Sequence, residues 1–237
     1  MPAYFWTTDP REAEREQLAL RELVSVHSGP LRFTRGLAIG TAYDENSRCC
    51  LAIGIPFNQY GRCEAPFEAR IREVNFPYLP GLLAFRVGPA ICALLDDVAD
   101  EFDLLVFDAQ GIAHARGLGL ASHIGVLYDK PSIGITRNPL FGSFVPPVPG
   151  KFTHTSILHP RRNITIGYVL CLGVGCEPVY VSPGHRISLR ETLIVMRKIA
   201  GRGCFPQPLR RAHAAANAAA RKLWRRHETE NRLKEFP

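Results

Sequence analysis

The pattern of apolar and polar positions is most distinctive around residues 104–107, where four apolar residues follow one another without a break. Such a run is typical of a strand that is buried on both faces of a sheet. Asp108 follows it directly, and the small residues of 111–122 predict a tight turn and a closely packed helix. This order places Asp108 at the carboxyl edge of a sheet, where open α/β folds bind ligands. The alternative is that Asp108 only caps the helix.

The rest of the pattern predicts an α/β fold. Asp9, with Pro10 and Glu12 after it, predicts a capped helix that runs to about residue 26. Ser188 and Glu191 predict the start of another helix. The other predicted elements are an antiparallel meander over 31–43, 49–57 and 62–76, a helix over 82–102, a short parallel strand over 131–135, a hairpin over 164–174 and 177–184, and a C-terminal helix over about 210–233.

Composition and charge narrow the class of protein. A chain of 237 residues with 46% apolar content is expected to form a single domain over residues 1–237. The net charge of +7 arises mostly in a basic tail, residues 210–237, which predicts either a polyanionic partner or a solvated helix. The seven cysteines form no CxxC pair, and the sequence shows neither an apolar leader nor a membrane-length apolar run. We therefore expect a cytoplasmic protein that does not bind membranes, with cysteines in its core.

Three further positions are candidates for chemistry. Pro77 and Pro80 stiffen a short loop that holds Tyr78 and Leu79 outward, and an aromatic at such a tip can insert into a base stack. The alternative is that the prolines merely end a strand. Arg137 is predicted at the same sheet edge as Asp108. His185 is predicted at a strand-to-helix junction, where a histidine also serves as a structural hydrogen-bonding residue.

Several of these stretches together resemble the endonuclease V family, the deoxyinosine 3′ endonucleases. The similar segments are PYLPG and LLAFR over residues 77–86, VFDAQGIAHARGLGLASHIG over 106–125, PSIGITR over 131–137 and SPGHRIS over 182–188. Their order and spacing cover roughly residues 10–215. The resemblance implies a ribonuclease H-like α/β fold, a mixed sheet flanked by helices.

The resemblance also implies a reaction, metal-dependent hydrolysis of the second phosphodiester 3′ to deoxyinosine, or to inosine in RNA. It implies DNA repair or RNA metabolism, a Mg²⁺ or Mn²⁺ cofactor, and a DNA or RNA partner that contains inosine or a distorted base. A monomer is favoured. Carried over residue by residue, the catalytic positions are Asp108, His185 and Arg137, the wedge is Pro77, Tyr78, Leu79 and Pro80, and the base pocket includes Gly81, Leu83, Gly111 and His114, with Asp108 as metal ligand.

The sequence departs from the family pattern at two metal carboxylates. Ala42 and Val87 stand where the family has an aspartate and a glutamate. Asp44 faces the same side of the predicted strand as Ala42 and is a candidate replacement ligand, although it also begins a polar turn. Glu73 is a more remote candidate. The alternative function is therefore a catalytically inactive module that binds inosine- or lesion-containing nucleic acid.

Overall fold

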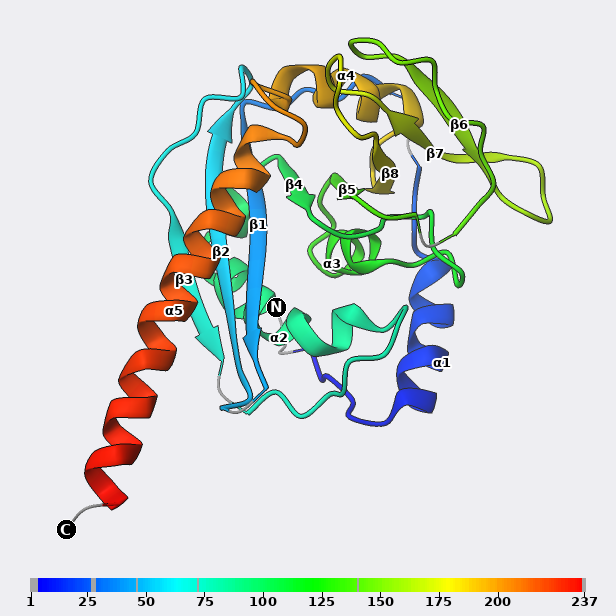
Figure 1. Cartoon of the computed structure of the whole chain (residues 1–237). Helices are drawn as coiled ribbons and strands as arrows, with labels where there is room; N and C mark the ends of the chain where they lie inside the picture. Colours follow the sequence, from blue (N-terminus) through cyan, green and yellow to red (C-terminus); the bar gives the residue numbers. More distant parts are fainter. Residues whose placement is uncertain (1–3, 27–28, 46, 72, 140, 236–237) are drawn as a thin grey trace.

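A mixed β-sheet forms the centre of the molecule (Figure 1). The computed structural model describes residues 4–26, 29–45, 47–71, 73–139 and 141–235. Within these residues, eight strands lie in the order β3-β2-β1-β4-β5-β8-β7-β6. Their bounds are β1 Arg35–Asp44, β2 Cys49–Asn58, β3 Phe67–Ile71, β4 Leu104–Phe107, β5 Ser132–Thr136, β6 His154–Leu158, β7 Thr165–Leu170 and β8 Val179–His185. The predicted α/β fold with a mixed sheet is confirmed.

Strand directions follow the predicted topology. The first three strands form the antiparallel meander, β4 runs parallel to β1, and β5 runs parallel to β4. The last three strands pair antiparallel with their neighbours. The parallel pair β4 and β5 lies in the middle of the sheet, so their carboxyl ends share one edge.

Helices cover both faces of the sheet (Figure 1). Their bounds are α1 Pro10–Arg21, α2 Leu83–Val98, the short 3₁₀ helix Ala99–Glu101, α3 Leu120–Leu127, α4 Leu189–Ile199 and α5 Gln207–Glu235. Asp9 and Ser188 are the N-caps of α1 and α4, as predicted, and their side chains accept hydrogen bonds from Arg11 N and Glu191 N. Helix α1 ends earlier than predicted.

The alternation of β4 divides the core into two layers. Leu105 and Phe107 pack in the cluster that includes α2 and α3, whereas Leu104 and Val106 pack in the cluster that includes α4. All four side chains are at most 1% exposed. This confirms the prediction of a strand that is buried on both faces. Because side chains alternate between the two faces of a sheet, Asp108 points to the same face as Leu104 and Val106, the face that α4 and α5 cover.

Helix α5 lies along β1 and β2 and continues beyond them (Figure 1). Its contact stripe consists of alanines at four-residue spacing, Ala212, Ala216 and Ala220, which pack on apolar residues of β2. Small side chains let the helix approach closely: a Cβ atom added at Gly40 of β1 would lie 2.8 Å from the backbone of Ala212. The first half of the basic tail is therefore packed on the sheet.

Two features were not predicted. Strand β6 pairs with β7 after the proline-rich segment 141–150, and Cys176 forms a disulfide with Cys204. Cys49 and Cys50 are buried, as expected for core cysteines, and Cys171 is buried as well, whereas Cys63, also expected in the core, is only half-buried. Among the helices of the described residues, none has the length and apolar character that crossing a membrane requires.

Candidate nucleic-acid site

Most of the predicted site residues line one pocket of about 400 Å³. It opens between the loop before α2 and the carboxyl edge of β4 and β5. The predicted residues in its wall are Tyr78, Leu79, Pro80, Gly81, Leu83, Asp108, His114 and Arg137, and it is also lined by Gln17, Ala84, Ala109, Gln110, Gly119, Leu120, Thr136 and Asn138. Segments far apart in the sequence thus meet around a space whose volume lies in the range of small-molecule binding sites.

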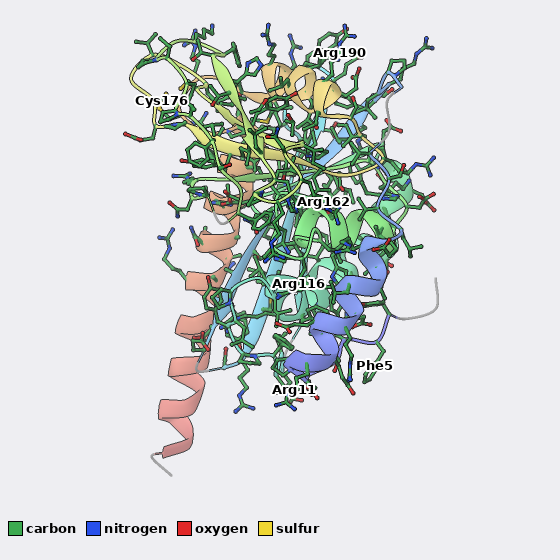
Figure 2. The ribbon with its side chains drawn as sticks, turned by 90° about the vertical axis from the view of Figure 1, so that its right-hand side faces the viewer. Phe5, Arg11, Arg116, Arg162, Cys176 and Arg190 are labelled. Carbon is green, nitrogen blue, oxygen red and sulfur yellow. A yellow bond between two sulfur atoms is a disulfide. The ribbon has the colours of Figure 1, made fainter. Side chains whose placement is uncertain are left out.

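A polar network anchors the wedge loop at its base. The carbonyl oxygen of Gly81 accepts hydrogen bonds from Gln17 Nε2 at 2.9 Å, His114 Nε2 at 3.0 Å and Arg116 Nη2 at 3.0 Å. Gly81 adopts φ +84°, a left-handed conformation that glycine tolerates without strain. Figure 2 shows Arg116 beside α1, where its guanidinium also binds Gln17 and Glu14. The loop that presents Tyr78 is therefore fixed to α1 and to the β4–α3 segment.

His114 is neutral in this network. Its Nδ1 accepts from the backbone N–H of Arg116 at 3.2 Å while its Nε2 faces the Gly81 carbonyl, which fits the tautomer with the proton on Nε2. The residue is only 4% exposed. Burial, followed by the charge of Arg116, lowers the pKa of His114 to about 4. His114 thus serves as an uncharged hydrogen-bond donor in the pocket wall.

The partner of Asp108 comes from α5. His213 Nε2 lies 2.9 Å from Asp108 Oδ2, and both side chains are roughly one-third exposed. This contact follows from the alternation of β4, which turns Asp108 toward the helix on that face. Sequence reasoning did not single out His213. The signal was available, because His213 is a polar residue at the contact surface of an alanine-rich helix.

A second, smaller cavity of about 110 Å³ lies beside this pair. It is lined by Asp108, His213 and apolar residues that include Leu83 and Ile91 of α2. Val87 lies four residues from each of those two, on the same face of the helix, and is only 4% exposed. Position 87, where the resemblance implies a glutamate, therefore lies on the helix face that reaches this cavity through Leu83 and Ile91, and its valine packs in the core.

His185 lies at the opposite sheet edge from Asp108. Strand β8 runs antiparallel to β5, and His185 pairs with Ser132 at the amino end of β5. Its ring bonds to Asp129 Oδ1 at 3.1 Å and accepts from the backbone N–H of Ser25 at 3.2 Å. The bond from His185, with the nearby positive charge of Arg186, lowers the pKa of Asp129. The structural interpretation of His185 fits these contacts, and the expected convergence with Asp108 is not found.

Two more predicted residues lie beside the pocket. Gly111 packs against β8, where its N–H donates to Ser182 Oγ and an added Cβ would lie 2.0 Å from the carbonyl oxygen of Pro183. Its neighbour Gln110 reaches the pocket wall instead. Pro77 lines a different cleft, on the other side of Tyr78. Gln17 and Asn138 were missed because neither belongs to a segment that carries the resemblance.

The residues present do not fit the divalent metal that the family resemblance implies. In the part of the chain that the structure describes, no group of three or more His, Cys, Asp or Glu side chains is arranged to hold a metal ion. Asp44 accepts from Ser47 N and Ser47 Oγ in the β1–β2 turn. The register of β1 and β4 puts it four residues, about 13 Å, beyond the level of Asp108. Glu73 is exposed in the loop after β3.

The sheet order, the helices on both faces and the acidic residue at the end of the central parallel strand define a ribonuclease H-like protein. Among solved structures, an endonuclease V from Streptomyces avermitilis is similar at a TM-score of 0.81 and 31% identity, over 92% of this chain and 96% of that one. An endonuclease V from Ciona intestinalis, solved with a DNA that contains an inosine followed by a ribo-adenosine, shares the fold at a TM-score of 0.76 and 18% identity, over 91% of this chain and 100% of that one.

Sequence comparison names the family. The family model for Endonuclease V matches residues 16–214. The endonuclease V of Thermus thermophilus is 37% identical over 216 residues, which are 90% of this chain and 95% of that protein. That of Kosmotoga olearia is 39% identical over 208 residues, 88% of this chain and 91% of that protein. The chain belongs to the endonuclease V family, a family of nucleic-acid endonucleases.

Proposed function

We propose that the protein recognises inosine in DNA or RNA by extruding the base into the 400 Å³ pocket while Tyr78 takes its place in the stack. The single observation that carries this proposal is that Tyr78, 66% exposed at the tip of an anchored loop, forms the rim of a pocket whose wall also holds Asp108 and Arg137. The DNA complex of the Ciona intestinalis relative supports the choice of inosine.

The pocket supplies the groups that such recognition needs. Leu79, Leu83 and Leu120 provide an apolar wall for the faces of a purine, and Gln110 and Asn138 provide amides near its edge. Arg137 is exposed at the mouth and is suited to contact a backbone phosphate. Base selection and backbone contact are therefore assigned to different residues.

Binding assays with labelled duplexes test the proposal. The protein is expected to bind a duplex with one inosine at least about tenfold more tightly than the same duplex with guanosine, as expected when a pocket reads one base edge. Arg137→Ala should weaken both complexes by the same factor, because a phosphate contact carries no sequence information. The matched variant Arg190→Ala, on the exposed start of α4, should leave both unchanged. Equal affinity of the wild type for both duplexes would refute inosine recognition.

A second candidate function is cleavage of the bound strand. The observation that favours it is the Asp108 and His213 pair, whose Asp108 lines the same pocket as Arg137. Incubation of the labelled inosine duplex with Mg²⁺ or Mn²⁺ tests it, with Asp108→Ala as the control that should abolish any product. Retention of the duplex without product would leave recognition as the function of the site.

A further inference from the structure

Tyr78 lines two neighbouring cavities. On one side lies the pocket that holds Asp108, and on the other lies an open cleft of about 740 Å³. The cleft lies between the β1–β2 turn and the wedge loop, and its lining residues include Tyr43, Arg48, Asn75 and Arg86. If the Tyr78 ring enters a base stack, it therefore has a cavity on each side that could hold a base.

A stacked cation forms the back of this cleft. The guanidinium of Arg86 lies 3.8 Å from the ring centre of Tyr43 and 5.7 Å from that of Tyr78, and its side chain is only 7% exposed. Glu45 forms an ion pair with it. The hydroxyl of Tyr43 donates to the carbonyl of Val74 at 3.2 Å, which fixes that ring. Arg86 supports the 66% exposed ring of Tyr78 from inside the cleft, and an exposed aromatic face of this kind is one on which any nucleobase can stack.

Hydrogen-bonding groups lie at the rim of the same cleft. Arg48 Nη1 donates to Asn75 Oδ1 at 3.1 Å, and both side chains are exposed. A guanidinium carries five N–H donors and an amide carries two, so the pair has donors for the edge of a base in addition to this bond. The cleft thus combines a stacking surface with edge donors, and its volume lies within the range of ligand sites.

We propose that this cleft binds the nucleobase of the opposite strand, the one left without a partner when inosine is extruded. The inference rests on the proposed function, since extrusion of one base is what leaves the other unpaired. The position of Tyr78 between the two cavities places the extruded base on one side of the ring and the orphaned base on the other. The protein then recognises a duplex by holding both members of the disrupted pair.

The test compares duplexes that differ only opposite the inosine. One carries cytosine there, and the other carries an abasic spacer that removes the base the cleft would hold. Arg48→Met keeps the length of the side chain and removes its donors, and Arg162→Met is the matched control at an exposed turn between β6 and β7 (Figure 2). Arg48→Met is expected to weaken binding of the cytosine duplex about tenfold and that of the abasic duplex less than about twofold. Arg162→Met should change the affinities for the cytosine duplex and the abasic duplex by the same factor or leave both unchanged.

Each other outcome is decisive. If Arg48→Met weakens both duplexes by the same factor, Arg48 is a general phosphate contact and the proposal is wrong. No weakening of either duplex also overturns it, and Asn75→Ala, which removes the other rim group, provides an independent second variant. Binding of single-stranded inosine oligonucleotide should be the same for wild type and Arg48→Met. If the wild type binds the inosine duplex no more tightly than the guanosine duplex, the proposed function itself is refuted.

Discussion

Restoring the two family carboxylates tests whether positions 42 and 87 converge on Asp108. The double variant Ala42→Asp/Val87→Glu adds two charges on β1 and α2, two of the elements that line the 110 Å³ cavity beside Asp108, and this cavity has room for a cation with bound water. Ala42 lies two residues, about 7 Å, beyond the level of Asp108 on the neighbouring strand. Mg²⁺ and Mn²⁺ bind oxygen at about 2 Å, so aspartates at that separation can share one ion.

The magnitudes follow from burial. Val87 is 4% exposed, so a glutamate in its place without a cation costs about 3 kcal/mol of unfolding free energy. For a chain of this length, that loss corresponds to a fall in Tm of about 6–12 °C. A metal ion present at about a thousand times its Kd returns about 4 kcal/mol to the folded state. The double variant should therefore be less stable than the wild type in EDTA and recover in Mn²⁺.

Thermal unfolding in EDTA and in excess Mn²⁺ measures this coupling. The control is Ala42→Asn/Val87→Gln, which has nearly the same shape and lacks the charges. A Tm gain in Mn²⁺ that only the carboxylate variant shows, with cleavage of an inosine duplex under the same conditions, would support the geometry. If the carboxylate and amide variants respond equally to Mn²⁺, the two positions do not converge on Asp108 and the metal-site interpretation fails.

Three further predictions concern other parts of the molecule. Tyr78→Ala should lower affinity for an inosine duplex about tenfold and leave Tm unchanged, because the ring is 66% exposed; Tyr78→Phe is the control, and an equal loss there would contradict a stacking role. Folding lowers the pKa of His114 from 6.5 to about 4, so protonation of this residue in the unfolded chain should lower the free energy of unfolding by about 3 kcal/mol as the pH falls from 6.5 to 4. Denaturant titrations of His114→Asn should lack this pH-dependent loss, and a variant with the same pH dependence as the wild type would refute the prediction. Cys176→Ser/Cys204→Ser, which opens a loop of 28 residues, should lower unfolding free energy by about 3–4 kcal/mol; a dithiol reductant should do the same to the wild type only.

The fold was largely predictable because its strands and helices carry strong local signals. The apolar run of 104–107 and the capping residues Asp9 and Ser188 each correspond to an observed element boundary. Strand β6 was missed because its residues, His154–Leu158, alternate weakly between apolar and polar and are paired as a strand by β7, with one further bridge from Ser143. Long-range pairing of this kind leaves little trace in the segment itself.

The candidate site was predictable in part. Residues adjacent to one another in the motifs, such as Tyr78 and Gly81, or at the ends of neighbouring parallel strands, such as Asp108 and Arg137, do line one pocket. His185 does not line this pocket. The prediction placed it at the end of a strand but did not fix the direction of that strand, which runs antiparallel to β5. His213 was missed because its contact with Asp108 depends on which helix covers that face of the sheet.

The proposed base pocket and the positions of the two absent carboxylates lie on different elements of the fold. The loop that carries Tyr78 and the edge that carries Asp108 and Arg137 form the pocket, whereas the missing carboxylates belong to β1 and α2. Three carboxylates close together repel one another and need a cation to offset that repulsion and their desolvation. A single carboxylate bonded to His213 needs none. Val87 packs in the core, and Ala42 is partly buried against the cluster that α5 forms with β2. The pocket and the wedge therefore keep their geometry without a metal ion, and Asp108 is the residue that the proposed base recognition and the proposed cleavage share.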